Sequence, residues 1–235
     1  MKPKAILKIC IDVAMTILFL MQMGYHMLDT RVHEYTGIAL CVLFILHHVL
    51  NGGWHKGLFK GKYAASRILL TVIDMLLTLA MAAVIVSAVL VSRHAFDFLG
   101  LHLRSLGRQI HMPATMWAFV LTGLHLGLHW SLFLGMAKRA CKGKASKVAV
   151  LLLRAALLAV FVFGAYEFVR RGLWMELFRL REFAFLEYGE SLLAFVSAYI
   201  AILAMWAAVT HYLSKAVKAL SAKRHRKPIE GRITQ

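Results

Sequence analysis

The chain has 235 residues, of which 60% are apolar and 17% charged, and its mean hydropathy is +0.69. These values exclude an ordinary soluble globular domain and indicate an integral membrane protein. Lys and Arg number 28 against 11 acidic residues, an excess that in a soluble protein would suggest nucleic-acid binding. Three scattered cysteines, none in a CxxCH pattern, exclude a disulfide framework and a covalently attached c-type haem.

Six apolar stretches are long enough to cross a hydrocarbon core of about 30 Å, which needs about 20 helical residues. Because lipid offers no partner for exposed backbone, we predict an all-α integral membrane protein of six helices. The start, Met1 to Leu20, is similar to a signal peptide, but Asp12 interrupts its apolar region and no cleavage site follows, so we expect an uncleaved first span. The six spans are 5–27, 33–54, 65–92, 110–136, 147–169 and 189–213.

The distribution of Lys and Arg predicts that both termini are cytoplasmic. Nineteen of these residues lie at the N-terminus, in the connections after the second and fourth spans, and in the C-terminal tail. The opposite side carries eight Arg and no Lys. The same rule accounts for the basic run 223–227, so we expect contact with the lipid bilayer and no nucleic-acid partner.

The two long outer connections, 95–110 and 172–189, mix Phe, Leu and Trp with Arg and Glu. This composition predicts short helices in the outer interface, which either cap a site or only anchor the chain. We expect most of the acids around the second connection to form weak pairs in water with nearby arginines. The acids are Glu167, Glu176, Glu182, Glu187 and Glu190, and the arginines are Arg170, Arg171, Arg179 and Arg181.

Histidines inside the spans form a repeated pattern. His33 and His47 in the second span are 14 residues apart, as are His111 and His125 in the fourth. Fourteen helical residues leave two side chains about 40° apart around the axis and about 21 Å apart along it. Spans two and four run in the same direction, so we predict that His33 lies level with His111, and His47 level with His125.

Two stacked histidine pairs within lipid favour b-type haem held through both of its faces. Zinc fits less well, because it usually takes three or four protein ligands. Copper transport past His and the 12 Met residues is an alternative, although Met is also a common filler of apolar helices. The alternate ligands are His48, beside His47, and His129, which is in rotational register with His111.

Several motifs resemble the small di-haem cytochromes b of the flavinylation-associated family. The resemblance extends more loosely to cytochrome b subunits of respiratory formate dehydrogenases and quinol oxidoreductases, and it covers about the first 140 residues. It implies two haem b groups, transmembrane electron transfer and a flavin-bearing partner outside the membrane. The motifs are His33-x-x-x-Gly37, His47-His48-x-x-Asn51-x-x-Trp54, and His111 followed by His125-Leu-Gly-Leu-His129-Trp130.

We therefore expect residues 1–140 to form a four-helix di-haem bundle, 141–214 to add two spans with an outer interfacial segment, and 215–235 to form a basic cytoplasmic tail. The expected function is electron relay between a quinone pool and an extracytoplasmic flavin- or haem-bearing redox protein, in the inner membrane of a bacterium. The chain would be the quinol-oxidising subunit of an oxidoreductase, since it has no GxGxxG fingerprint for a redox module of its own. The alternatives are a membrane metal or haem transporter and a membrane anchor with incidental histidines.

Three charged residues lie well inside their spans on the cytoplasmic half: Asp12, Asp74 and Arg154. Charges in such places are usually paired or functional. We expect Arg154 to meet a carboxylate or a propionate of the inner haem, with Asp74 or Asp12 as a proton carrier for quinone. An ion pair between helices without catalysis is the alternative.

At the outer end, Arg104, Arg108 and His111 share one helix face if the helix of the fourth span begins before Pro113. The two arginines would then neutralise the propionates of the outer haem. Glu34, beside His33, is a candidate acceptor of quinol protons. A further outer cluster could serve a quinol site or replace an outer ligand: His26, His94 and His102.

Overall fold

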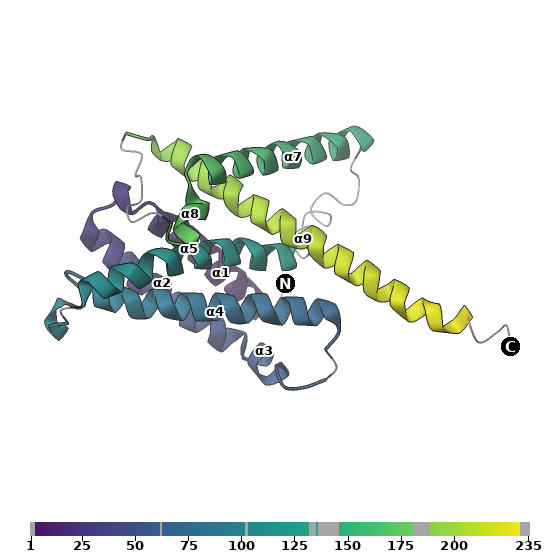
Figure 1. Ribbon diagram of the computed structural model, residues 1–235, viewed down its shortest axis with the longest axis horizontal. Helices are drawn as coiled ribbons and strands as arrows, with labels where there is room; N and C mark the ends of the chain where they lie inside the picture. Colours follow the sequence, from purple (N-terminus) through teal and green to yellow (C-terminus); the bar gives the residue numbers. More distant parts are fainter. Residues whose placement is uncertain are drawn as a thin grey trace.

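The computed structural model describes residues 3–61, 63–101, 103–131, 135, 146–180 and 189–230, with side chains as far as Ala222. All regular structure in these residues is helical, which confirms the all-α prediction (Figure 1). Five of the described helices are long and apolar enough to cross a membrane. They are α1 (Pro3–Met23), α2 (Thr30–Leu50), α4 (Ala65–Val91), α7 (Lys147–Arg170) and α9 (Leu192–Glu230, over Leu192–Ala222).

The predicted fourth span, 110–136, corresponds to α5 (Arg104–Leu128), and much of the rest of that span lies outside the described residues. This helix contains two Arg, two His and a Gln, so it is less apolar than the five above. It is instead the central helix, packed against α4, α9 and the short α8 (Leu173–Leu177). The buried core includes Phe119 of α5, which is fully covered. Figure 1 shows α5 between α4 and the pair α7 and α9.

Two glycines allow α5 to lie close to α9. A Cβ atom on Gly127 would overlap the carbonyl oxygen of Ala207, and one on Gly123 would lie 2.7 Å from the Cβ of Trp206. Small residues four apart commonly permit such close packing between membrane helices. His125 lies two residues after Gly123, about 200° around the helix, and therefore projects away from α9.

Short helices join the long ones: η1 (Tyr25–Met27), α3 (Gly52–Gly57), η2 (Asp97–Leu99) and α8. The two long connections therefore contain short helices, as predicted, but α8 packs inward. Its Leu173 and Leu177 are buried, and the carbonyl of Leu177 accepts a hydrogen bond of 3.0 Å from Trp117 Nε1 of α5. Beyond residue 214, where a tail was predicted, the helix α9 continues to Glu230 and extends away from the other helices (Figure 1).

The first half of α7 is exposed on every side from Lys147 to Val160. Its leucines include Leu151 and Leu158, which are 66% and 63% exposed among the described residues. An all-round apolar surface of this kind fits a helix that contacts lipid. Many apolar side chains of α1, α2 and α4 are exposed as well.

Candidate functional site

Each histidine repeat lies on one uninterrupted helix. His33 and His47 are both in α2, which begins after Asp29, whose side chain accepts a hydrogen bond of 2.8 Å from the backbone N–H of Arg31. His111 and His125 are both in α5, which begins at Arg104 and continues through Pro113. The 14-residue spacing therefore becomes a rise of about 21 Å in each helix. We call His33 and His111 the His33 level, and His47 and His125 the His47 level.

A cavity of about 960 Å³, counting the space at its open side, contains the His33 level. Both His33 and His111 line it, with Gly37 and residues of α1, α2, α4 and α5 that are mostly apolar. Along the described residues, neither α4 nor α5 packs extensively against α2, so the cavity separates the two histidine-bearing helices.

Two residues in the lining of this cavity carry buried polar atoms that have no hydrogen-bond partner within the described chain, His33 Nδ1 and Thr115 Oγ1. A buried polar atom without a partner is costly, so a bound group is a reasonable cause. On the facing helix, His111 Nδ1 lies 3.1 Å from the hydroxyl of Ser87, which is fully buried. Since the hydroxyl holds Nδ1, Nε2 of His111 is left free to bind a metal.

At the His47 level, each imidazole ring forms a hydrogen bond with a carboxylate. His47 Nδ1 lies 2.6 Å from Oδ1 of Asp12 in α1, and His125 Nδ1 lies 2.8 Å from Oδ1 of Asp74 in α4. The two imidazole side chains are equally exposed, at 24%. A carboxylate that accepts the proton on Nδ1 fixes the tautomer in which Nε2 carries a free electron pair. Metal-binding histidines are usually oriented in this way.

Neither aspartate is the carboxylate that Arg154 was expected to meet, because both acids bond to histidines. Arg154 is exposed on α7, which packs against α8 and α9. The contacts of the two aspartates with the histidines were not predicted from the sequence.

A repeat in the sequence could have revealed the role of the aspartates. The hairpin formed by α1 and α2 recurs as α4 and α5, and identical residues occupy equivalent positions around both Asp and His. The Thr one turn after each Asp donates a hydrogen bond of 2.8 Å to the carbonyl of that Asp in both copies. In the first helices, Ile6-Leu7-x3-Ile11-Asp12-x3-Thr16 matches Ile68-Leu69-x3-Ile73-Asp74-x3-Thr78. In the second helices, Val42-Leu43-x2-Leu46-His47-x2-Leu50 matches Val120-Leu121-x2-Leu124-His125-x2-Leu128.

The repeat also separates the two pairs from the alternate ligands. Each level takes one histidine from each copy, whereas the position equivalent to His48 is Leu126, and the position equivalent to His129 is Asn51. His48 Nδ1 instead lies 3.1 Å from Nε2 of His55 in α3. The ring of His129 packs 4.8 Å from that of His125, without a carboxylate partner among the described contacts. His47 and His125 are therefore the better candidates for ligands.

Glu34 of α2 binds the start of the connection that follows α4. Its carboxylate accepts hydrogen bonds from the Ser92 hydroxyl at 2.8 Å and from the backbone N–H groups of Arg93, His94 and Ala95 at 2.7, 3.0 and 2.8 Å. Four donors stabilise the charged carboxylate, which disfavours the predicted role as a proton acceptor.

The arginines and histidines that were predicted to gather at the outer end do not form one cluster among the described residues. Arg104, at the start of α5, forms an ion pair with Asp97, and Arg108 is exposed one turn later on the same helix as His111. The ring of His26 packs against Phe195 of α9 at 5.7 Å. His94 is exposed, and His102 lies outside the described residues.

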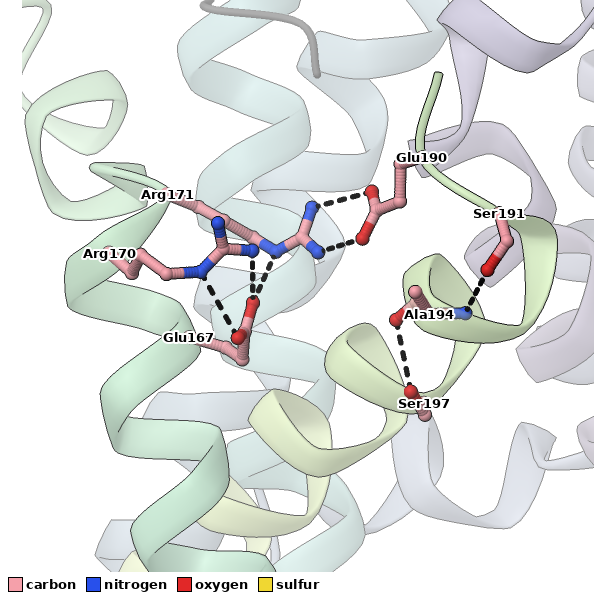
Figure 2. A network of polar contacts seen from close by, with 7 residues as sticks. All are labelled: Glu167, Arg170, Arg171, Glu190, Ser191, Ala194 and Ser197. Atoms are coloured by element: carbon pink, nitrogen blue, oxygen red, sulfur yellow. Dashed lines mark hydrogen bonds and ion pairs between the residues drawn. The ribbon is translucent and has the colours of Figure 1, made fainter. Parts of the chain in front are cut away.

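Two of the five acids near the second long connection, Glu167 and Glu190, belong to a buried network and do not form the weak pairs in water that were predicted (Figure 2). The Glu167 carboxylate accepts hydrogen bonds from Arg170 Nη2 at 2.9 Å and Arg171 Nε at 2.8 Å. The guanidinium of Arg171 also bonds both carboxylate oxygens of Glu190. The side chains of Glu167, Arg171 and Glu190 are only 7–8% exposed. The network joins the end of α7 to the segment before α9, while Arg181, Glu182 and Glu187 lie outside the described residues.

Within the described chain, no group of three or more His, Cys, Asp or Glu is arranged to hold a metal ion directly. A haem iron held axially needs only two protein ligands, which is the number that each level provides. Comparisons with protein-family models, curated proteins and solved structures found no match. The residues of both levels fit haem by their donor type, and those of the His33 level also by their largely apolar surroundings.

Proposed function

We propose that this protein is a di-haem cytochrome b that relays electrons across a membrane, between a quinone pool and a redox protein outside the cytoplasm. The observation that carries the proposal is the matched Asp–His geometry in two copies of one hairpin, at 2.6 and 2.8 Å. A histidine with its Nδ1 held by a carboxylate is suited to metal binding through Nε2. An apolar cavity between the histidines of the other level supports a flat, largely apolar ligand.

The residues of the chain would divide the work as follows. His33 and His111 would hold one haem, and His47 and His125 the other, while Asp12, Asp74 and Ser87 orient three of these rings. A bound haem supplies one-electron chemistry at an iron whose potential depends on its ligands and surroundings. Buried apolar side chains between the levels, among them Leu40, Met81 and Met116, would exclude water from the path.

The charge distribution supports one orientation of this relay. Both termini would be cytoplasmic, so the His47 level would be the inner one and the His33 level the outer one. Arg104 and Arg108 would then lie at the outer mouth, where they can neutralise propionates and meet an extracytoplasmic flavin- or haem-bearing partner. The membrane would be the inner membrane of a bacterium, and α5 would be the sixth span, shielded from lipid by its neighbours.

A membrane metal or haem transporter is the second candidate. The contact of 3.1 Å between His48 and His55 favours it, because it places two imidazoles together at one end of α2. A transporter would pass its cargo between such sites and would not retain two haems after purification.

An optical spectrum separates the two candidates. We expect the purified full-length protein to show b-type α and Soret bands that increase on reduction with dithionite. Alanine variants of His33, His47, His111 and His125 should each lose about half of the low-spin signal, whereas His94→Ala, a matched exposed control, should lose none. A colourless protein that binds divalent metal would favour transport.

A further inference from the structure

The two levels differ in the groups that support their ligands. At the His47 level both imidazoles bond to carboxylates, of Asp12 and Asp74. At the His33 level His111 meets neutral groups, the hydroxyl of Ser87 and the backbone of Val84, and His33 Nδ1 has no hydrogen-bond partner among the described residues. The repeat makes the comparison a close one, because the histidines of both levels come from the same two helices.

Near the His33 level, the two repeats have no acidic residue in the place that Asp12 and Asp74 occupy at the His47 level. Thirteen residues after Asp12 is Tyr25, and thirteen after Asp74 is Ser87. The ring of Tyr25 packs edge-on against His33 with centroids 5.0 Å apart, so it contributes a contact but no anionic acceptor. The carboxylate of Glu34 accepts hydrogen bonds from four donors in the connection after α4, so among the described residues it does not bond to a histidine ring.

We propose that Asp12 and Asp74 hold the inner haem, at the His47 level, at a lower reduction potential than the outer haem at the His33 level. The proposal rests on the proposed function, since it assumes a haem at each level. A carboxylate behind an imidazole makes that ligand a stronger electron donor, and two anions nearby favour the more positive, oxidised iron. A hydroxyl has no comparable effect.

The consequence is a direction for the relay. In the partly reduced protein a single electron would reside at the outer level, and an electron delivered at the inner level would move outward. Such a transfer would move one electron from the group held at the His47 level to the group held at the His33 level, and it would form or break no bond. Asp12 and Asp74 act through the histidines and are therefore positioning residues.

Neighbouring cations do not directly cancel the difference in negative charge between the His47 level and the His33 level. Lys8, one turn before Asp12 in α1, donates a hydrogen bond of 2.8 Å to the amide oxygen of Asn51. At the other end, Arg104 is paired with Asp97, and Arg108 is exposed on α5. Lys8 and Arg108 leave positive charge at both ends of the bundle, whereas carboxylates bonded to the rings occur at only one level.

The order of potentials is tested with single-haem variants of the full chain. His111→Ala should leave only the inner haem, and His125→Ala only the outer one. Redox titration followed at the α band should give a lower midpoint potential in His111→Ala than in His125→Ala. An equal or higher midpoint in His111→Ala would overturn the proposal. This comparison needs no change at either aspartate.

The role of the carboxylates is tested by Asp12→Asn and Asp74→Asn, which preserve shape and a hydrogen-bonding oxygen but remove the charge. Each should raise the midpoint potential in the His111→Ala background and leave it unchanged in the His125→Ala background. Glu230→Gln, which removes one negative charge where α9 ends, should move neither potential. The electron paramagnetic resonance signal of the inner low-spin haem should also shift in the two Asn variants, a change that a merely structural role would not produce.

Two failures remain distinguishable. A wild-type protein without haem would contradict the proposed function itself. A wild-type protein with two haems whose inner potential does not respond to either Asn substitution would overturn only the role of Asp12 and Asp74.

Discussion

Oδ1 of Asp12 lies 2.6 Å from Nδ1 of His47, and the same two atom types lie 2.8 Å apart in Asp74 and His125. The second pair occupies the equivalent positions of a repeated helical hairpin. Each aspartate is on the first helix of its hairpin and each histidine is near the end of the second. A duplicated contact of this kind ties both rings to fixed orientations and leaves both Nε2 atoms available for one ligand.

The first prediction concerns the choice of ligand in α5. We expect His125→Ala to lose one haem per chain and His129→Ala to keep both, because only His125 has a carboxylate behind its ring and a counterpart in the repeat. Haem content after purification and the low-spin electron paramagnetic resonance signal measure this. Loss of haem from His129→Ala with retention in His125→Ala would reverse the ligand assignment.

The second prediction concerns the outer arginines. Replacing Arg104 and Arg108 together by Gln should lower the potential of the outer haem, since removing cations near propionates favours the oxidised iron. The inner potential should not move. Arg154→Gln is the matched control, because Arg154 is exposed on α7, and it should leave both potentials unchanged. If redox titration shows no outer shift and the partner is reduced normally, the arginines do not belong to the site.

Five of the six predicted spans, and the position of each histidine repeat on one helix, could be predicted from the sequence because both depend on local periodicity. The partners of Asp12 and Asp74 could not be predicted in that way, since they depend on how neighbouring helices are rotated against each other. The repeat contains this information, but only if the flanking Ile, Leu and Thr residues are compared along with the histidines. Glu34 was misread for a related reason: its four donors come from a connection about 60 residues later.

The surface assignment of Glu167 and Glu190 failed because α8 packs inward. A short connection rich in Arg and Glu is usually solvated, and composition alone cannot show that its helix covers α5. Once Leu173 and Leu177 are buried, the adjoining charges are buried with them and must pair with one another.

The third prediction tests this buried network. Arg171→Met should destabilise the protein by roughly 3–5 kcal/mol, because it leaves Glu190 buried without the guanidinium that bonds both of its carboxylate oxygens, while Glu167 keeps Arg170. Thermal unfolding in detergent measures the loss. The double variant that also carries Glu190→Gln should recover part of the stability, since the unpaired charge is removed. Absence of any recovery would mean that Arg171 acts through packing alone.

The fourth prediction concerns the close packing of α5 and α9. Gly127→Ala should destabilise the protein by about 1–3 kcal/mol, because the new Cβ would overlap the carbonyl oxygen of Ala207 and force the two backbones apart. It should also loosen the inner haem, since α5 carries His125. Gly53→Ala in α3 is the control, with nothing within 4 Å of the new Cβ. Equal thermal stability of the two variants would show that the helices can separate without cost.

The central claim is that two haem b groups are held by four histidines, and the haem content of the purified full-length protein tests it most directly. The pyridine haemochrome assay should give two haem b per chain for the wild type. It should give one for His125→Ala, whose ring is held by Asp74. A wild-type value near zero, or a value of two that survives replacement of all four histidines, would contradict the account.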